Sequence, residues 1–526
     1  MNIVLLHCHY DRGGVTTVVL NQVNSLLRDP KIEGIYLISS GRSSGLPLEL
    51  TDRVHVLSLE SLEYDQEVYD WDATKKRIED VSDDLLRLMR SHRLSADNTL
   101  LHWHNHSLGK NTAIPGVVAR VAIAGWRSLL QIHDFAEDFR PANYAGIIRA
   151  IGAEEPVCVE QYLYPSAPQI HYATLTRSDG NILKEWGLPE ERVSVLPNCV
   201  DVGSVDPCYG EHEKAEAMGR VRQAFGLPSD SRWSIYPVRG IRRKNVGEFL
   251  LLSQLSDEDQ YSGITLRPSS PVEKKSYLRW KSVAESVAPR AVFDAGERSS
   301  ISFRDNVVAS DNIISTSVAE GFGMAYLEPW LFGRGVVARR LNAVVADFED
   351  SGMNLSRCYN SLPVIGDPEW VDHCLKAHQL SFQKAWKQMP DAMRPVATQF
   401  RFLGKVSSGF RDRIDFALLT PKLQADFLER GYRDKGLMQA IRNDLPDLVR
   451  SLRGAEEDAA IAKNVQRISE RFGFDSNKRR LFECYEHLLG APIEGKVDSL
   501  DNKHRMIDLV LGRQSFFPCR TEEGLG

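Results

Sequence analysis

The sequence predicts an α/β protein with two parallel-sheet domains followed by a helical region. Short apolar runs alternate with amphipathic helical patterns over the first 200 residues, and a second such series begins near residue 232. Strands that alternate with helices are typical of parallel sheets covered on both faces. A chain of 526 residues is also too long for one ordinary core. We therefore expect domains at 1–205 and 206–370 and a helical region at 371–526.

Each domain is expected to contain a series of short strands. In the first domain these are residues 3–6, 35–38, 54–57, 99–103, 128–132, 173–176 and 194–196. In the second they are residues 233–238, 263–267, 291–295, 312–316 and 335–338. Amphipathic stretches such as 15–28 and 74–92 are expected to be helices between strands. The polar segment D-P-C-Y-G-E-H-E-K-A-E-A, which begins at residue 206, is expected to connect the domains.

The last third of the sequence predicts helices. Strand signals fade beyond residue 365, and apolar residues recur with helical spacing in 366–390, 411–431, 435–452 and 455–490. Part of this region is interpreted as a helical cap, a surface for homo-oligomerisation or a wall of an acceptor site.

Composition excludes several classes of protein. The net charge of −6 argues against a nucleic-acid partner. No apolar run reaches the roughly 18–20 residues that span a bilayer, and the first apolar run, interrupted by His7, is interpreted as a buried strand and not as a signal peptide. The eight cysteines show no C-x-x-C pairing, which favours a reducing, cytoplasmic location without disulfides or structural zinc.

The segment 315–338 carries the strongest functional signal. Gly321, Phe322 and Gly323 form a tight loop before a helix that is expected to start near Met324. Such a loop leaves backbone N–H groups unpaired at the positive end of the helix dipole, which favours a phosphate group. The loop therefore predicts a phosphate-binding site.

Two glutamates bracket this loop. Glu320 precedes it, and Glu328 is expected about one turn into the helix, where a carboxylate can accept hydrogen bonds from ribose or sugar hydroxyls. The segment resembles the E-x7-E motif of retaining glycosyltransferases with the GT-B fold, family 4 in particular. The resemblance covers about residues 1–380. It implies two Rossmann-like domains that face across a cleft, and one helix, between 380 and 430, that crosses back to the N-terminal domain.

A second motif supports the same family. Arg239 and Lys244 follow a predicted strand with four residues between them, similar to the R-x4-K pair of family 4 enzymes. Two cations can hold a diphosphate and stabilise charge on the leaving group, as a metal ion does in other glycosyltransferases. Arg242 and Arg243, between them, are expected to face solvent, with the alternative that either replaces a member of the pair. A basic surface turn is the structural alternative.

Two further motifs lie in the first domain. Gly13 and Gly14 follow the first strand and resemble the glycine loop that faces the donor phosphates in the family, although a plain tight turn explains them equally well. His133 and Asp134 end another strand, where ligands bind in open α/β sheets. The resemblance implies that His133 reaches the transferred sugar and that Asp134 orients His133 or the acceptor hydroxyl.

The sequence H-W-H-N-H at 102–106 allows three interpretations. His102, His104 and His106 would share one face of a strand, as metal ligands can, but no second cluster completes a metal site. Contact with an acceptor is the favoured interpretation for His104, His106 and the following Lys110, and a structural role is the third. The D-W-D triplet at 70–72 resembles a metal-binding Asp-x-Asp motif only weakly.

The motif V-L-P-N-C-V-D at 195–201 resembles the L-P-N-G-V-D that precedes the domain linker in the family. Cys199 replaces the usual glycine. Because cysteine tolerates positive φ poorly, we expect this turn to differ.

These motifs together predict a metal-independent retaining glycosyltransferase. It would move a sugar from a nucleotide-diphosphate sugar to a hydroxyl of a carbohydrate, small-molecule or lipid acceptor, without a cofactor. Catalytic roles are expected for His133, Arg239, Lys244 and Glu320; donor binding for Gly13, Gly14, Gly321, Phe322, Gly323, Met324 and Glu328; and acceptor binding for His104, His106, Lys110 and Asp134. The alternatives are a non-catalytic nucleotide-sugar-binding or scaffold relative and a zinc hydrolase.

Overall fold

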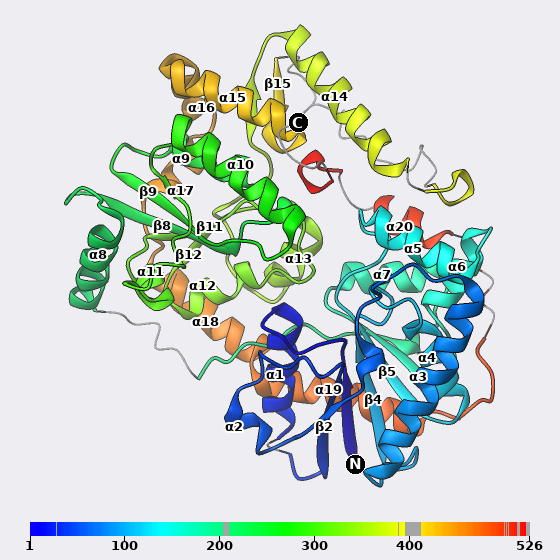
Figure 1. Ribbon diagram of the computed structural model, residues 1–526. Coiled ribbons are helices and arrows are strands. Elements are labelled where there is room, and N and C mark those ends of the chain that lie inside the picture. The colour runs from blue at the N-terminus through cyan, green and yellow to red at the C-terminus, as the bar shows by residue number, and fades with distance from the viewer. Residues whose placement is uncertain are drawn as a thin grey trace. The chain divides into compact units, whose positions relative to one another are not determined.

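The chain folds into two compact units, each built on its own parallel sheet (Figure 1). The computed structural model describes residues 1–27, 29–203, 210–387, 389–394, 412–498, 500, 502, 504–512 and 516–521. Unit 1 contains Met1–Asp201, Trp386–Arg401 and Glu470–Gln514; unit 2 contains Val202–Ala385, Phe402–Ser469 and Ser515–Gly526. Two Rossmann-like domains confirm the predicted α/β class. No helix in the described ranges is both long and apolar enough to cross a membrane.

Unit 1 contains a seven-stranded sheet with the order β3-β2-β1-β4-β5-β6-β7, and every pair is parallel. All seven predicted strands are confirmed. Their side chains are buried on both faces in β1, β4 and β6, which explains the continuous apolar runs. The strands are β1 Asn2–Leu6, β2 Gly34–Ser39, β3 His55–Ser58, β4 Thr99–His104, β5 Arg127–Ile132, β6 Ile170–Thr174 and β7 Val193–Val195.

Helices cover this sheet. Among them, α19 packs beside α1, so a segment from the last tenth of the chain completes the core of unit 1 (Figure 1). The longer helices are α1 Gly14–Leu26, α3 Trp71–Ser91, α4 Ile114–Ile123, α5 Pro141–Ile151, α6 Pro156–Leu163, α7 Arg177–Trp186, α19 Phe474–Gly490 and α20 Met506–Gly512.

Unit 2 contains a six-stranded parallel sheet with the order β10-β9-β8-β11-β12-β13. The five predicted strands are confirmed, but β10 is shorter than expected because Asp294 adopts a left-handed φ of 63°, which ends the extended conformation. The sixth strand, β13, was not predicted, since two residues give no pattern. The strands are β8 Arg232–Arg239, β9 Gln260–Leu266, β10 Ala291–Val292, β11 Asn312–Ser315, β12 Gly335–Arg339 and β13 Cys358–Tyr359.

The two faces of this second sheet have separate apolar cores. Tyr236 of β8 belongs to the core with α9 and α10, whereas its neighbour Ile235 belongs to the core with α8 and α11, as the alternation of side chains along a strand requires. The helices are α8 Glu211–Phe225, α9 Val246–Leu255, α10 Pro271–Val287, α11 Phe303–Val308, α12 Glu328–Leu331, α13 Asn342–Asp350 and α14 Pro368–Trp386.

The segment expected to connect the domains is largely helical. Residues from 211 onward form α8, whose Ala217, Met218 and Val221 are buried in the unit 2 core at helical spacing. The connector prediction is therefore wrong for these residues. Residues 206–209 of that segment lie outside the described residues.

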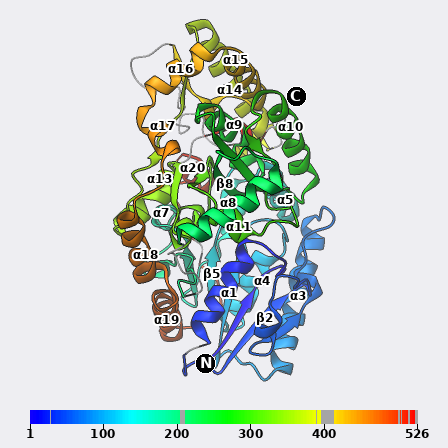
Figure 2. The ribbon, with the colours of Figure 1, turned by 90° about the vertical axis from the view of Figure 1, so that its left-hand side faces the viewer.

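Breakers divide the predicted C-terminal helices. The expected helix at 435–452 is two helices, because Pro446 cannot continue the first, and the one at 455–490 is interrupted at Gly473. Figure 2 shows α16 and α17 in succession in unit 2, followed by α18, whose residues from Glu470 onward belong to unit 1. The helices are α15 Pro421–Arg433, α16 Lys435–Asp444, α17 Pro446–Arg453 and α18 Asp458–Phe472, and residues before α15 form β15 Arg413–Asp415, which pairs with β14 Pro363–Ile365.

The helix expected to cross back between 380 and 430 has a different position. Residues 386–394 do belong to unit 1, but the described residues among them contain only the last residue of α14, Trp386, and a 3-10 turn at Asp391–Met393; residues 388 and 395–411 lie outside the described residues. The long C-terminal helix of unit 1 is α19 instead.

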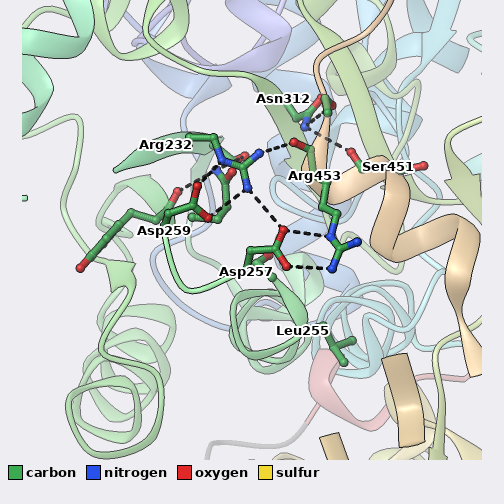
Figure 3. A network of polar contacts seen from close by, with 12 residues as sticks. Arg232, Leu255, Asp257, Asp259, Asn312, Ser451 and Arg453 are labelled. Carbon is green, nitrogen blue, oxygen red and sulfur yellow. Dashed lines mark hydrogen bonds and ion pairs between the residues drawn. The ribbon is translucent and has the colours of Figure 1, made fainter. Parts of the chain in front are cut away.

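A polar network connects α17 to the amino ends of β8 and β11 in the unit 2 sheet (Figure 3). Arg232, at the start of β8, bonds the Asp259 carboxylate at 2.8 Å and also donates to the carbonyl oxygen of Arg453. Arg453 in turn bonds Asp257 at 2.9 Å, and Asn312, at the start of β11, donates to the carbonyl oxygen of Gly454. The helices α15 to α17 are therefore an integral part of unit 2.

A buried guanidinium joins the carboxyl end of β12 to α9 and to β15. Arg339, at the end of β12, is 2% exposed and binds Glu248 of α9 and Asp415 of β15, each through two hydrogen bonds of 2.7–2.8 Å. Tyr359 also donates to Glu248, and the backbone N–H of Leu362 donates to Asp415. Every charge in the cluster thus has a partner, which is what makes its burial tolerable.

Replacing Arg339 with Met is expected to destabilise the protein by about 3–5 kcal/mol, because the buried Glu248 and the partly buried Asp415 lose their counter-ion. Urea unfolding at neutral pH measures the change. The matched control is Arg340→Met, since Arg340 pairs with Glu349 near the surface and should contribute about 1 kcal/mol or less. Equal losses in the two variants would contradict the assignment.

Candidate functional site

The predicted donor residues of unit 2 gather where its strand order reverses. β8 and β11 are adjacent and parallel, and the chain continues outward from them in opposite directions. Ligands in open α/β sheets bind at the carboxyl ends of strands beside such a reversal. Arg239 ends β8, and the segment after Ser315 of β11 leads to Glu320.

Lys244 lies in a rigidly held turn at this edge. Residues Arg242–Lys244 form a 3-10 turn, and Asn245 follows in the left-handed region at φ 47°, which asparagine tolerates better than most residues. The carbonyl oxygen of Lys244 accepts hydrogen bonds from Tyr236 at 3.2 Å and from Thr316 at 2.8 Å. The turn is therefore attached to both central strands.

Glu320 pairs with two cations. Its carboxylate contacts Nζ of Lys244 and lies 3.2 Å from Nη1 of Arg243, and its side chain is 9% exposed. Burial alone would raise the pKa of Glu320, but the charges of Lys244 and Arg243 outweigh it and lower the pKa to about 2. The pKa of Lys244 is lowered. Burial and the neighbouring charge of Arg243 disfavour its charged form by more than Glu320 favours it. Glu320 is thus ionised at neutral pH.

The two arginines before Lys244 are not simply exposed, contrary to the prediction. Arg243 donates to Glu320 and to the carbonyl oxygen of Ala319, while Arg242 bonds Glu273 at 3.1 Å. Arg242 also donates to the carbonyl oxygen of Thr521 at 3.4 Å. With three residues per turn, neighbours in a 3-10 turn lie about 120° apart, so both can reach protein partners. The R-x4-K spacing alone did not reveal Arg243.

Arg239 has a different environment from Lys244. Its side chain is exposed, and it forms no ion pair or side-chain hydrogen bond with the described residues. The structure therefore joins Lys244 to Glu320 but does not bring Arg239 into that cluster.

The loop after Glu320 requires glycine at one position. Gly323 has φ 89°, and a Cβ there would lie 2.5 Å from Cγ1 of Val344 and 2.8 Å from Cδ2 of Tyr326. Phe322 is buried edge-on against Phe348, with ring centroids 5.3 Å apart. These contacts fix the loop between Gly321 and Met324.

The helix after this loop differs from the prediction. Met324–Tyr326 is a 3-10 turn, and α12 begins only at Glu328, so Glu328 is the first residue of a new helix and does not lie one turn into an existing one. The cause is Pro329, which has no N–H with which to extend the preceding turn. Glu328 is exposed, yet desolvation by surrounding protein raises its pKa to about 7.

The glycine loop of unit 1 is open. Gly13 and Gly14 are exposed, neither adopts the left-handed conformation, and a Cβ on Gly14 would meet nothing within 4 Å. α1 begins at Gly14, one residue earlier than expected. The surrounding fold thus does not require these glycines, and the backbone here is accessible to a ligand.

His133 directly follows β5, and its backbone is held by Asn105. The side-chain oxygen of Asn105 accepts hydrogen bonds from the N–H groups of His133 at 2.8 Å and Asp134 at 3.2 Å. Asp134 pairs with Arg140 at 3.0 Å, whereas the ring of His133 contacts His104. The described partner of the His133 ring is thus His104, and that of Asp134 is Arg140.

The three histidines at 102–106 do not share a strand face. β4 ends at His104, and Asn105 turns the chain with φ 56°, so His106 points to the carbonyl oxygen of Leu163. In the described part of the chain no three His, Cys, Asp or Glu side chains are placed to hold a metal ion. This geometry gives the zinc-hydrolase interpretation no support. The D-W-D triplet has a structural role at the start of α3, because the side chain of Asp70 accepts a hydrogen bond from the N–H of Ala73.

A small pocket of about 20 Å³ lies at the carboxyl edge of the unit 1 sheet. It contains three of the predicted acceptor residues, His104, His106 and Lys110, but not Asp134. Lys110 is exposed, and its Nζ lies 5.8 Å from the centre of the Tyr64 ring. The remaining lining residues are Leu6, His7, Cys8, Leu62, Trp103, Asn105, Asn111 and Ile114.

Cys199 avoids the left-handed region, as expected for a residue that replaces glycine in this turn. It is buried, and its carbonyl oxygen accepts a hydrogen bond from Asn21 of α1 at 2.8 Å.

Known proteins share this architecture. No protein-family model matches the chain. The mannosylglucosyl-3-phosphoglycerate synthase of Petrotoga mobilis is 29% identical over 358 residues, which is 66% of this chain and 66% of that protein, just under two thirds of each.

Two solved structures are similar over nearly their whole length. Anabaena Alr3699/HepE in complex with UDP-glucose has a TM-score of 0.52 and 14% identity, over 92% of this chain and 99% of that one. Sucrose-phosphate synthase from Thermosynechococcus elongatus has a TM-score of 0.52 and 13% identity, over 93% and 98%. With the two parallel-sheet units, these likenesses identify the fold as GT-B.

A buried carboxyl four positions after His133 was missed in the sequence. Glu137 is 1% exposed; its Oε2 accepts a hydrogen bond from Tyr164 at 2.8 Å, and its Oε1 has no partner among the described residues. Burial raises the pKa of Glu137 from 4.5 to about 7. No pattern in the sequence distinguishes it from a surface glutamate.

The wild-type protein is expected to lose stability relative to Glu137→Gln as the pH rises from 4.5 to 7. The folded state binds the Glu137 proton more tightly than the unfolded state, so stability falls as that proton is released, by roughly 3 kcal/mol in total. Urea unfolding of both proteins between pH 4 and pH 8 measures the difference. The exposed Glu154→Gln is the control, and a pH-independent difference for Glu137→Gln would refute the assignment.

Proposed function

We propose that the protein is a glycosyltransferase that moves a sugar from a nucleotide-diphosphate sugar to a hydroxyl group of an acceptor. The observation that carries the proposal is the cluster of Lys244, Arg243 and Glu320 at the carboxyl ends of β8 and β11. Cations can bind the two phosphates, and an ionised carboxylate can accept hydrogen bonds from sugar hydroxyls. The UDP-glucose complex of HepE and the name of the Petrotoga relative support the same reaction class.

The finer proposal is a retaining, metal-independent enzyme similar to family 4. Arg239 and Lys244 would bind the diphosphate and stabilise the charge that develops on the leaving group, a task that metal ions perform in other glycosyltransferases. Glu320 would hold the hydroxyls of the sugar, and Glu328 those of the ribose. Arg239 is suited to its part because its exposed side chain has no protein counter-ion in the described chain. The leaving oxygen would take the proton of the acceptor on the same face of the sugar.

The acceptor residues of unit 1 remain predictions of the same proposal. His104, His106 and Lys110 line one pocket, and a cation there suits an acceptor that carries a negative charge. Because the Petrotoga relative is named for mannosylglucosyl-3-phosphoglycerate, glucosyl-3-phosphoglycerate is the first acceptor to test.

The first test is a thermal-shift screen with UDP, GDP and ADP and their sugar conjugates, with and without EDTA. A nucleotide present at 100 times its Kd stabilises the folded state by about 2.7 kcal/mol, which raises Tm measurably. We expect one nucleotide to shift Tm equally with and without EDTA. A protein whose Tm no nucleotide changes would favour the non-catalytic alternative.

Lys244→Met is expected to lower kcat on the order of 100-fold with the preferred donor, because the leaving diphosphate loses a preorganised cation. Initial rates of nucleotide release measure this, and proton NMR of the product tests retention. Lys376→Met is the control, since Lys376 is exposed on α14 and pairs with the exposed Asp372. Undiminished turnover by Lys244→Met would remove that residue from the site.

A further inference from the structure

The imidazole ring of His133 is held by a second histidine. Nδ1 of His104 lies 2.9 Å from Nε2 of His133, with the ring centroids 5.2 Å apart and the planes at 42°. Both residues are buried, with 3% and 7% of their surface exposed. This contact occupies one ring nitrogen of His133 and leaves Nδ1 for any further partner.

A hydrogen bond between two imidazoles needs one N–H and one lone pair. Burial lowers the pKa of His133 to about 4 and that of His104 well below its ordinary value, so both rings are neutral at neutral pH. A neutral ring carries its proton on either Nδ1 or Nε2. Either His104 donates to His133 or the reverse, and each choice fixes both tautomers.

Oxygen acceptors fix the protons of the adjacent histidines. Nδ1 of His7 lies 3.1 Å from the carbonyl oxygen of His104, so it must donate. Nε2 of His102 lies 3.0 Å from Oε1 of Gln131 and donates there, while its Nδ1 accepts from the hydroxyl of Tyr485 at 3.0 Å. These bonds offer no partner to Nε2 of His104, which is buried without one among the described residues.

This unpartnered nitrogen distinguishes the two arrangements. If His133 donated, His104 would carry its proton on Nε2, as a buried N–H without an acceptor. If His104 donates, only a lone pair is unpartnered there. Orphaned buried N–H groups are rarer in proteins than under-satisfied acceptors, so the second arrangement is favoured.

We propose that His104 is a positioning residue that donates from Nδ1 to Nε2 of His133 and thereby keeps the His133 proton on Nδ1. The proposal rests on the proposed function, in which His133 meets the transferred sugar, and it specifies how: Nδ1–H donates a hydrogen bond to a sugar oxygen. Asn105 fixes the backbone of His133, and His104 fixes its ring and its tautomer.

The proton position can be measured directly by ¹⁵N NMR of the full chain labelled at histidine, at neutral pH and without substrate. His133→Asn identifies the His133 signals. We expect a protonated Nδ1 and an unprotonated Nε2 in the wild type, and a mixture of tautomers in His104→Leu. A wild-type His133 protonated on Nε2, or a tautomer unchanged in His104→Leu, would overturn the proposal.

Kinetics supply the second readout. His104→Leu is expected to lower kcat about tenfold or more with little change in the KM for the donor, whereas His104→Asn, which keeps a side-chain N–H near the position of Nδ1, should retain most of kcat. His171→Leu is the control, because His171 is a buried histidine of the same sheet that bonds Ser194. Equal losses in His104→Asn and His104→Leu would count against positioning through the N–H.

The NMR and kinetic measurements distinguish a failure of the His104–His133 proposal from a failure of the proposed function. If His104→Leu fails to fold, the wild-type spectrum and His104→Asn still decide the proton position. A wild-type protein with the expected tautomer but without transferase activity would contradict the proposed function and leave the His104–His133 assignment intact.

Discussion

The structure of unit 2 depends on the burial of one positive charge. The guanidinium of Arg339 joins the end of β12 to α9 through Glu248 and to β15 through Asp415. Glu248 also accepts a hydrogen bond from Asn245, which directly follows Lys244. The ion cluster therefore sets the start of α9 and, with it, the turn that carries the candidate phosphate-binding cation. A buried charge of this kind gives a unique arrangement because any misplacement leaves it without partners.

The same logic applies at the candidate donor site. Lys244 is buried, which is acceptable only because the ionised Glu320 lies against it. The carboxylate that is proposed to bind sugar hydroxyls thus also stabilises the fold of the loop. Arg239, which is exposed and lacks such a partner in the described chain, carries no comparable constraint from the fold. Lys244 is thus proposed to serve both the fold and the donor site, whereas Arg239 is proposed to serve the donor site alone.

Local patterns predicted the strands well and the long-range contacts poorly. Short apolar runs and turn residues define β1 to β12, and motif spacing located Lys244 and Glu320, because both signals lie within a few adjacent residues. Pro329 was visible in the sequence, yet its effect on the start of α12 was missed. Arg339 and Asp415 are 76 positions apart, and no local pattern indicates that pair. The contact of His104 with His133, 29 positions apart, depends on the pairing of β4 with β5.

The hydrogen bond from Arg242 to Thr521 joins residues 279 positions apart, next to the turn that holds Lys244. In unit 1, the contact of His102 with Tyr485 spans 383 positions. Because a ribosome adds residues from the amino end, unit 1 cannot complete its contact before Tyr485 is synthesised, and unit 2 cannot complete its contact before Thr521 is synthesised. A nascent chain that already contains every predicted catalytic residue thus still lacks residues that complete the contacts of both units. The surfaces that these residues later cover are exposed until then, and exposed apolar surface favours misassembly during that interval.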